Sequence, residues 1–301
     1  MNCPLCKCED IELLEVVDKH LLSNQYEKLT NIDFSYLIAE DLKYCECQKC
    51  KLRFFNPLIT GDEVFYKALQ KFDWYYVDEK NEYDEAVKYI SSTDTVLDVG
   101  SGKGALSKVL PTKGYVGLDF SENAKLMAAK KGILIENEMI QDYADMYPSS
   151  FDVVVSFQVL EHVSEPASFI KAQIKALKSG GKLIISVPSE NSFLRYVNNG
   201  ILNMPPHHVT RWSDDTLEFI AEKYNLHLIS IFHDKVQDIH KVWFLATLVQ
   251  SFFLEKKLLD NAFYRKVILK LSELFSRFAV NGLKDEMLPN GHSVTVVYEK
   301  K

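Results

Sequence analysis

Short apolar runs alternate with amphipathic segments through the middle of this chain, and this alternation predicts buried strands connected by helices. We expect strands at residues 95–99, 114–118, 133–137, 151–157, 182–187 and 226–232. We expect helices at residues 81–90, 105–110, 122–131 and 166–178, the last ended by Gly180-Gly181. The regular alternation of strands and helices indicates a parallel α/β sheet. Apolar and polar residues alternate in the segment 293–299, which predicts a last, antiparallel strand.

Near the C-terminus, the segment 242–278 reads as two helices, and apolar residues recur there at intervals of three and four. The resulting apolar stripe consists of Leu259, Phe263, Val267, Leu271, Leu274 and Phe278. Residues 251–280 carry six basic and three acidic side chains, a local net charge of +3. We expect the stripe to pack on its own domain, although such a pair could also cover the substrate, form a homodimer interface or touch a membrane surface.

Two further segments differ from this pattern and divide the chain. All six cysteines lie in the first fifty residues, and aromatic residues crowd the segment 62–84. We therefore expect a small module at residues 1–60 and an aromatic-rich helical connector at 61–92. The main domain then covers 93–301, with a helical insertion at about 236–288.

Composition and charge exclude several classes of protein. The chain has 301 residues, of which 47% are hydrophobic, and this is ordinary for a globular protein. Its net charge of −7 argues against a nucleic-acid-binding protein, which would need a basic face. No secretory signal pattern opens the chain, and the longest apolar run, 242–254, is too short for a transmembrane segment. We expect a cytoplasmic protein.

The cysteines form two C-x-x-C pairs, Cys3-Pro-Leu-Cys6 and Cys47-Gln-Lys-Cys50. In a reducing compartment such clustering favours a metal over disulfides. Four thiolates can supply a closed tetrahedral site, so we expect a structural Zn²⁺. Cys8 and Cys45 could each replace a member of the nearer pair, and six reduced cysteines without metal are the alternative.

A glycine turn follows the expected strand 95–99, with Gly100, Gly102 and Gly104 at alternate positions. Glycine permits positive φ and lets a ligand approach bare backbone. A dinucleotide-binding turn would read G-x-G-x-x-G, whereas this one reads G-x-G-x-G. Asp98 stands two residues before the first glycine, where an acid would repel a pyrophosphate but suits an ammonium group.

The pattern D-x-G-x-G-x-G resembles motif I of the class I S-adenosylmethionine (SAM) methyltransferases. The later series F-D-V-V…L-E-H-V…L-K-S-G-G-K-L-I-I-S-V-P resembles their small-molecule members, in order and spacing, over roughly residues 80 to 235. The run C-x-x-C-x-L-x-F-x-N-P resembles the end of a zinc module fused to some of them, with Lys51 where those families often have glycine. The resemblance implies a Rossmann-like, seven-stranded class I methyltransferase sheet with a small N-terminal zinc-binding module and a C-terminal helical insertion.

The same resemblance assigns the cofactor site. Asp98 would lie near the ammonium group of SAM, Asp119 would accept hydrogen bonds from the ribose diol, and Gln158 would face the methionine part. One tyrosine of Trp74-Tyr75-Tyr76 could cover the cofactor. The expected cofactor-binding residues are Asp98, Gly100, Ser101, Gly102, Gly104, Asp119, Phe120, Met139 and Gln158.

The segment P-P-H-H-x-T-R-W, which ends at Trp212, resembles the loop after the fifth strand in zinc-module methyltransferases that act on sugars and polyketide-like metabolites. His207 or His208 is the expected catalytic base, with His162 of the L-E-H-V motif behind them, because histidine titrates near neutral pH. A structural loop that bonds its own backbone is the alternative. Enzymes that methylate base amines of nucleic acids carry D/N/S-P-P-Y/F after the fourth strand, where this chain reads Ser156-Phe-Gln-Val159.

We expect a SAM-dependent methyltransferase (EC 2.1.1.-) that acts on a hydroxyl or carbon of a small molecule, sugar or glycan precursor. One alternative is a non-catalytic interaction protein that holds zinc and SAM. A nicotinamide-dependent oxidoreductase is a further alternative, disfavoured by the glycine spacing and by Asp98.

Overall fold

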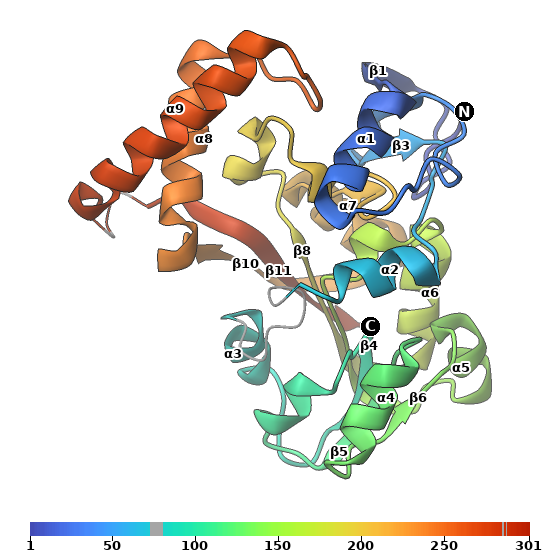
Figure 1. Cartoon of the computed structure of the whole chain (residues 1–301). Coiled ribbons are helices and arrows are strands. Elements are labelled where there is room, and N and C mark those ends of the chain that lie inside the picture. The colour runs from blue at the N-terminus through green and yellow to red at the C-terminus, as the bar shows by residue number, and fades with distance from the viewer. Residues whose placement is uncertain (73–80, 285, 287) are drawn as a thin grey trace.

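The computed structural model describes residues 1–72, 81–284, 286 and 288–301, and Figure 1 presents the whole chain. Within these residues a seven-stranded sheet has the order β10-β11-β8-β7-β4-β5-β6. Its strands are β4 (Thr95–Val99), β5 (Gly114–Leu118), β6 (Ile135–Glu136), β7 (Phe151–Phe157), β8 (Leu177–Pro188), β10 (Leu226–Lys235) and β11 (Asn290–Lys300). Neighbouring strands from β6 to β8 are parallel, and β11 runs antiparallel to both β8 and β10. The predicted α/β sheet and its antiparallel last strand are confirmed.

Helices before, between and after the parallel strands cover the sheet. They are α3 (Asn81–Val87), α4 (Glu122–Ala129), α5 (Ile140–Met146), α6 (Pro166–Ala176) and α7 (Asp214–Tyr224). The hydroxyl groups of Ser121 and Ser213 cap α4 and α7 by accepting hydrogen bonds from the N–H groups of Ala124 and Thr216. The apolar strand residues, such as Val154 and Ile185, are fully buried between the helical layers. Hydrophobic burial on both faces is what a parallel sheet requires.

Two predicted helix boundaries are wrong. The segment expected as a helix at 105–110 forms only a 3₁₀ turn, η1 (Ala105–Lys108). The helix expected to end at Gly180-Gly181 ends at Ala176 instead, and both glycines lie within β8. Gly180 has φ +75°, and a Cβ on Gly181 would lie 2.9 and 3.0 Å from two backbone oxygens. The two glycines therefore lie at an irregularity in the strand pairing, and they do not end the helix.

The N-terminal module has its own antiparallel sheet, of order β1-β2-β3-β9. It comprises β1 (Ile11–Val17), α1 (Lys19–Thr30), β2 (Leu42–Cys47) and β3 (Arg53–Asn56), followed by α2 (Glu63–Leu69). The fourth strand, β9 (Thr210–Arg211), belongs to the Pro-Pro-His-His segment and pairs Thr210 with Phe54. The module and this distant segment therefore share one sheet.

Two helices form a hairpin that projects from the molecule, at the upper left of Figure 1. They are α8 (Lys241–Phe253) and α9 (Phe263–Ala279), so the predicted helical pair is confirmed. The expected packing of the apolar stripe holds for Leu259, which is buried, but it is wrong for the part of the stripe on α9, because Phe263 is 82% exposed and Phe278 is 78% exposed. The face of α9 that is buried carries Ser272, Ser276 and Arg265 instead. Within the described residues, none of the helices is both long and apolar enough to cross a membrane.

Candidate functional site

The glycine turn has the conformation that its sequence predicts. Gly100, Gly102 and Gly104 have φ values of +78°, +53° and +73°, which favour glycine strongly. A Cβ on Gly100 would lie 2.3 Å from the side chain of Val159, and one on Gly104 would lie 2.8 Å from Ile133. The turn therefore brings its backbone close to the end of β7, and a larger residue would displace it.

Asp119 follows β5 and turns its carboxylate toward the glycine turn. Its Oδ2 accepts a hydrogen bond from the N–H of Gly102, and its Oδ1 accepts one from the N–H of Ser121, each at 2.8 Å. Burial raises the pKa of Asp119, and these two hydrogen bonds oppose that shift. Each carboxylate oxygen can accept a further bond, so the group can hold the turn and still bind a ligand hydroxyl.

Asp98, which precedes the turn in the chain, and Glu82 are buried acidic groups. The hydroxyl of Tyr115 donates to Asp98 Oδ2 at 2.8 Å, and burial together with the Asp98 charge raises the pKa of Tyr115. Gln158 Nε2 donates to Glu82 Oε1 at 3.2 Å and to the hydroxyls of Ser186 and Ser293 at 3.3 Å. Asp98, Glu82 and Gln158 thus form a polar wall that suits a cationic ammonium group.

One continuous cavity of about 1660 Å³ is lined by nearly all of the residues predicted to bind the cofactor or to take part in catalysis. Phe120 is 67% exposed and Met139 is 49% exposed, so both present apolar surface to a ligand in that cavity. Gly104 does not line the cavity and is the residue that immediately precedes η1. The predicted residues that do line it are Asp98, Gly100, Ser101, Gly102, Asp119, Phe120, Met139, Gln158, His162, His207 and His208.

The three predicted histidines meet in the wall of this cavity. One ring nitrogen of each lies within 4.8 Å of the others. The rings of His207 and His208 stack with centroids 4.5 Å apart, and the ring of His162 lies edge-on to both. Burial, and then the charge of His162, lowers the pKa of His207 to about 3. Burial also lowers the pKa of His208, so both rings are neutral at pH 7.

The N-terminal module holds the segment that carries His207 and His208. Tyr26 of α1 is fully buried, and its hydroxyl lies 2.8 Å from the carbonyl oxygens of Ile201 and Met204. The N–H of Phe55 in β3 donates to the carbonyl oxygen of Val209 at 3.0 Å. The position of the histidines in the cavity therefore depends on Tyr26 and Phe55, which lie far earlier in the chain; Tyr26 is 175 and 178 positions before its two partners.

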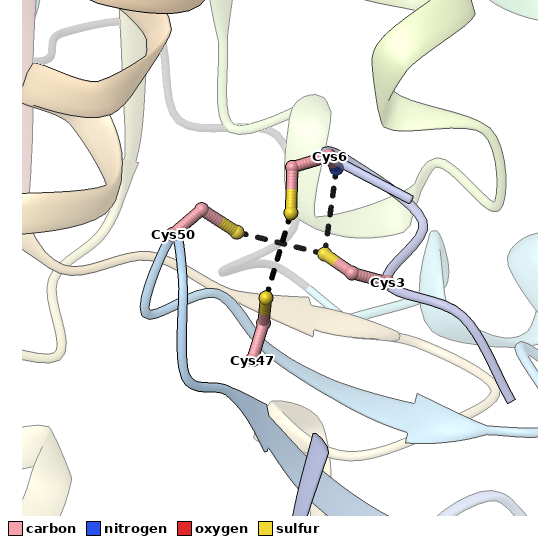
Figure 2. A group of neighbouring side chains, drawn as sticks. All are labelled: Cys3, Cys6, Cys47 and Cys50. Atoms are coloured by element: carbon pink, nitrogen blue, oxygen red, sulfur yellow. Dashed lines mark hydrogen bonds between the residues drawn. The ribbon is translucent and has the colours of Figure 1, made fainter. Parts of the chain in front are cut away.

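The four cysteines of the two C-x-x-C pairs converge, as Figure 2 shows. The sulfur atoms of Cys3 and Cys50 are 3.5 Å apart, as are those of Cys6 and Cys47. Tetrahedral coordination with Zn–S bonds of about 2.3 Å would separate the sulfurs by about 3.8 Å, so the group fits zinc. The Cys45 Sγ lies outside this group, 3.6 Å from the carbonyl oxygen of Lys43.

Lys51 keeps the turn for which related modules often use glycine. It has φ +58°, and its N–H donates to the carbonyl oxygen of Cys47 at 2.9 Å. The second C-x-x-C knuckle therefore closes in spite of the side chain.

The cavity wall also contains residues that were not predicted from the sequence, and among them are Glu82, Tyr66 and Glu161. Glu82 and Tyr66 lie in the connector, where the sequence offers no pattern that distinguishes a lining residue from a packing one. Glu161 belongs to the L-E-H-V motif. Its side chain is 1% exposed, and the sequence does not show this burial, which marks it as unusual for an acid. The predicted lid, Trp74-Tyr75-Tyr76, lies outside the described residues.

Comparisons with known proteins agree with this geometry. The model of a family described as a methyltransferase domain matches residues 74–231, more than half of the chain. A ubiquinone biosynthesis O-methyltransferase of Idiomarina loihiensis is 41% identical over 104 residues, which are 32% of this chain and 43% of that protein. One of Sodalis glossinidius is 29% identical over 167 residues, or 48% of this chain and 65% of that protein.

The chain thus covers less than two thirds of the length of these relatives. A SAM-dependent methyltransferase of Archaeoglobus fulgidus has a similar structure, with a TM-score of 0.53 and 17% identity. The alignment covers 78% of this chain and 100% of the other, and at this identity it concerns the fold.

Proposed function

The chain belongs to the methyltransferase-domain family, with the class I SAM-dependent fold, and on this premise we propose that it methylates a hydroxyl group of a small molecule. The observation that carries the proposal is the single cavity, which joins the glycine turn and Asp119 to the histidine cluster. Relatives named O-methyltransferases favour oxygen over carbon as the acceptor atom. The overall negative charge disfavours a nucleic-acid substrate.

We assign the cofactor to the side of the cavity that contains the glycine turn. Asp119 would bind the ribose hydroxyls, and the acidic wall of Asp98 and Glu82 would face the ammonium group. Phe120 and Met139 would lie against the adenine, because both present apolar surface to the cavity. SAM held by these residues would supply its methyl group to an acceptor in the remaining space of the cavity.

We assign the acceptor to the side with the histidines. Methyl transfer is an in-line displacement, in which the acceptor oxygen forms a bond to the methyl carbon while the S–CH₃ bond breaks. The bonding electron pair goes to sulfur, which gives S-adenosylhomocysteine, and the hydroxyl must lose its proton. A neutral buried imidazole can accept a hydrogen bond from that hydroxyl. Because the pKa of His207 is about 3, the ring alone is a weak base.

We also propose that Cys3, Cys6, Cys47 and Cys50 hold one structural Zn²⁺. Four thiolates leave no open position, so such an ion would stabilise the fold of the module and take no part in catalysis. The ion would affect the cavity only indirectly. It would stabilise the module, whose strand β3 pairs with β9 beside the histidines.

The decisive experiment measures release of S-adenosylhomocysteine from SAM with a panel of phenols and sugar alcohols. We expect turnover with one class, and His208→Ala should lower it by roughly 10²–10⁴-fold, the usual range for groups that assist proton transfer. His227→Ala, at an exposed histidine, is the matched control and should retain full turnover. SAM binding without turnover on any acceptor would favour a non-catalytic binding protein.

A further inference from the structure

The start of α8 forms a wall of the cavity to which the proposed methyl transfer gives no role. His240 and Trp243 line the cavity from this end of the helix, and His292 of β11 lines it beside His240. His292 is followed by Ser293, whose hydroxyl lies 3.3 Å from Gln158 Nε2. The wall therefore adjoins the polar residues that we assign to the ammonium group of SAM.

Packing on the main sheet holds this wall in place. Phe244 of α8 is buried and lies edge-on to Phe193, which follows β8, with ring centroids 5.7 Å apart. The carbonyl oxygen of His292 accepts a hydrogen bond from the N–H of Ser189, directly after β8, at 2.8 Å. Because the protein's own contacts order the wall, a ligand does not have to supply that ordering when it binds.

Aromatic rings pack edge to face in the wall. The ring of Trp243 lies edge-on to Phe193, and the ring of His240 lies edge-on to His292, with centroids 4.8 and 4.6 Å apart. His240 is also edge-on to Trp243, at 5.8 Å. Trp243 is 38% exposed, so it still presents ring surface to the cavity. Aromatic rings prefer edge-on or offset contact with one another, so the wall suits a planar aromatic ligand.

His240 adds one polar feature to this aromatic surface. Its Nδ1 is buried, and none of the described residues forms a hydrogen bond with that atom. Burial, followed by the charge of His292, lowers the pKa of His240 to about 4, so the ring is neutral at pH 7. A nitrogen of a neutral imidazole either donates or accepts, and a hydroxyl group can do both. A ligand hydroxyl therefore complements His240 in either tautomer.

Three asparagines line the acceptor side, and the protein itself uses their amide groups. They are Asn198, Asn199 and Asn203. Asn199 exchanges two hydrogen bonds with the backbone of Asp260, at 2.8 and 2.9 Å, and Asn203 Oδ1 lies 3.0 Å from His208 Nδ1. Asn198 Oδ1 accepts a hydrogen bond from a backbone N–H at 2.9 Å. A sugar would bury several hydroxyl groups, each of which needs a partner, so this surface favours an acceptor with fewer of them.

We propose that Trp243 and His240 bind the ring of an aromatic acceptor, a phenol, and select it over sugars. Trp243 would lie against the ring, and His240 would form a hydrogen bond with a ring hydroxyl. That this ligand is the methyl acceptor rests on the proposed function, whereas binding of the ring to the wall does not. The helical insertion would then determine the class of acceptor, while the glycine turn and Asp119 hold the cofactor.

Ligand NMR titrations of the full chain with bound S-adenosylhomocysteine test this wall. They compare catechol with cyclohexane-1,2-diol, which has the same ring size and the same hydroxyl groups but is not aromatic. We expect catechol to bind more tightly by roughly 10-fold or more, because only its ring can make aromatic contacts with Trp243. Myo-inositol, which has a hydroxyl group on every ring carbon, should bind more weakly than either.

Variants of the wall should change catechol binding and leave SAM binding unchanged. Trp243→Ala should weaken catechol binding by roughly 10-fold or more, whereas Trp243→Phe, which keeps a ring, should stay within about 3-fold of wild type. Phe252→Ala, at an exposed phenylalanine of the same helix outside the cavity lining, is the matched control. His240→Phe removes the ring nitrogens and should weaken catechol about 3- to 10-fold without weakening benzene. Thermal unfolding identifies any variant that does not fold.

The results separate this wall from the proposed reaction. Catechol binding that is unchanged in folded Trp243→Ala would overturn the proposal, as would tighter binding of cyclohexane-1,2-diol or myo-inositol. Absence of catechol binding to wild type would also overturn it. Catechol that binds at Trp243 but yields no S-adenosylhomocysteine from SAM would support the wall as an aromatic binding site and would contradict the proposed methyl transfer to phenols.

Discussion

Arg53 and Glu190 form an ion pair that joins the N-terminal module to the main sheet. Arg53 Nη1 lies 2.8 Å from Glu190 Oε2, and Glu190 follows the end of β8. Glu190 also lies 3.7 Å from the buried guanidinium of Arg211, in the strand beside the histidines. One buried carboxylate therefore connects β3, β8 and β9, so the module is part of the architecture of the cavity.

Removal of this carboxylate should destabilise the protein. Glu190→Ala leaves Arg211 buried without its acid, and we expect the free energy of unfolding to fall by about 3 kcal/mol in urea titrations. Asp145→Ala, which removes an exposed ion pair with Lys175, should cost less than about 1 kcal/mol. Equal effects of the two variants would contradict the structural role of Glu190.

Asp119→Ala should weaken the binding of SAM. The variant removes the acceptor proposed for the ribose hydroxyls and also the bond to Gly102 that holds the turn. Loss of a hydrogen bond to a charged group costs about 1.5–3 kcal/mol, which corresponds to a roughly 10- to 150-fold weaker affinity by calorimetry. Asp142→Ala, at an exposed aspartate, should bind SAM normally. An unchanged affinity in folded Asp119→Ala would refute the assignment.

Removal of one cysteine of the group should release the structural zinc. Cys47→Ser should lose the thiolate charge-transfer bands of the Co²⁺-substituted protein and should loosen residues 1–57 in hydrogen exchange, because metal binding contributes to folding. Cys45→Ser should keep both the bands and the protection, because its sulfur lies outside the group. The reverse result would place Cys45 among the ligands.

Asp234 should make stability depend on pH. It is 5% exposed, and burial, followed by the charge of Glu82, raises its pKa to about 6. A raised pKa means that the folded state binds the proton more tightly than the unfolded state. Its contribution is complete below the unfolded value of 3.8 and is lost as the pH rises through about 6.

The expected loss is roughly 3 kcal/mol, since two pKa units are involved. Relative to Asp234→Asn, wild type should therefore be more stable at pH 4 than at pH 8 by about that amount, as measured by urea unfolding at each pH. A difference between the two proteins that does not vary with pH would contradict the buried, protonated carboxyl.

The sequence by itself determined the local conformations and the positions of the strands along the chain. The three glycines at alternate positions predicted a turn with positive φ, and each C-x-x-C pair predicted a metal-binding turn. The apolar runs located every strand of the main sheet. These features depend on the steric limits and hydrophobicity of neighbouring residues, so short stretches are enough to predict them. The same stretches misplaced the end of α6, since Gly180 and Gly181 suit a strand irregularity as well as a helix end.

Only the tertiary structure decided which distant residues meet. Nothing local to Thr210 indicates that it pairs with Phe54, and nothing local to Glu82 indicates that it contacts Gln158. The apolar stripe of α9 specified a helix with one apolar face, but its direction depends on what the rest of the chain offers as a partner. Here Gln250 binds the polar face at Ser272, so the apolar face remains outside. Such contacts are set by the packing of the whole molecule, which sequence periodicity does not contain.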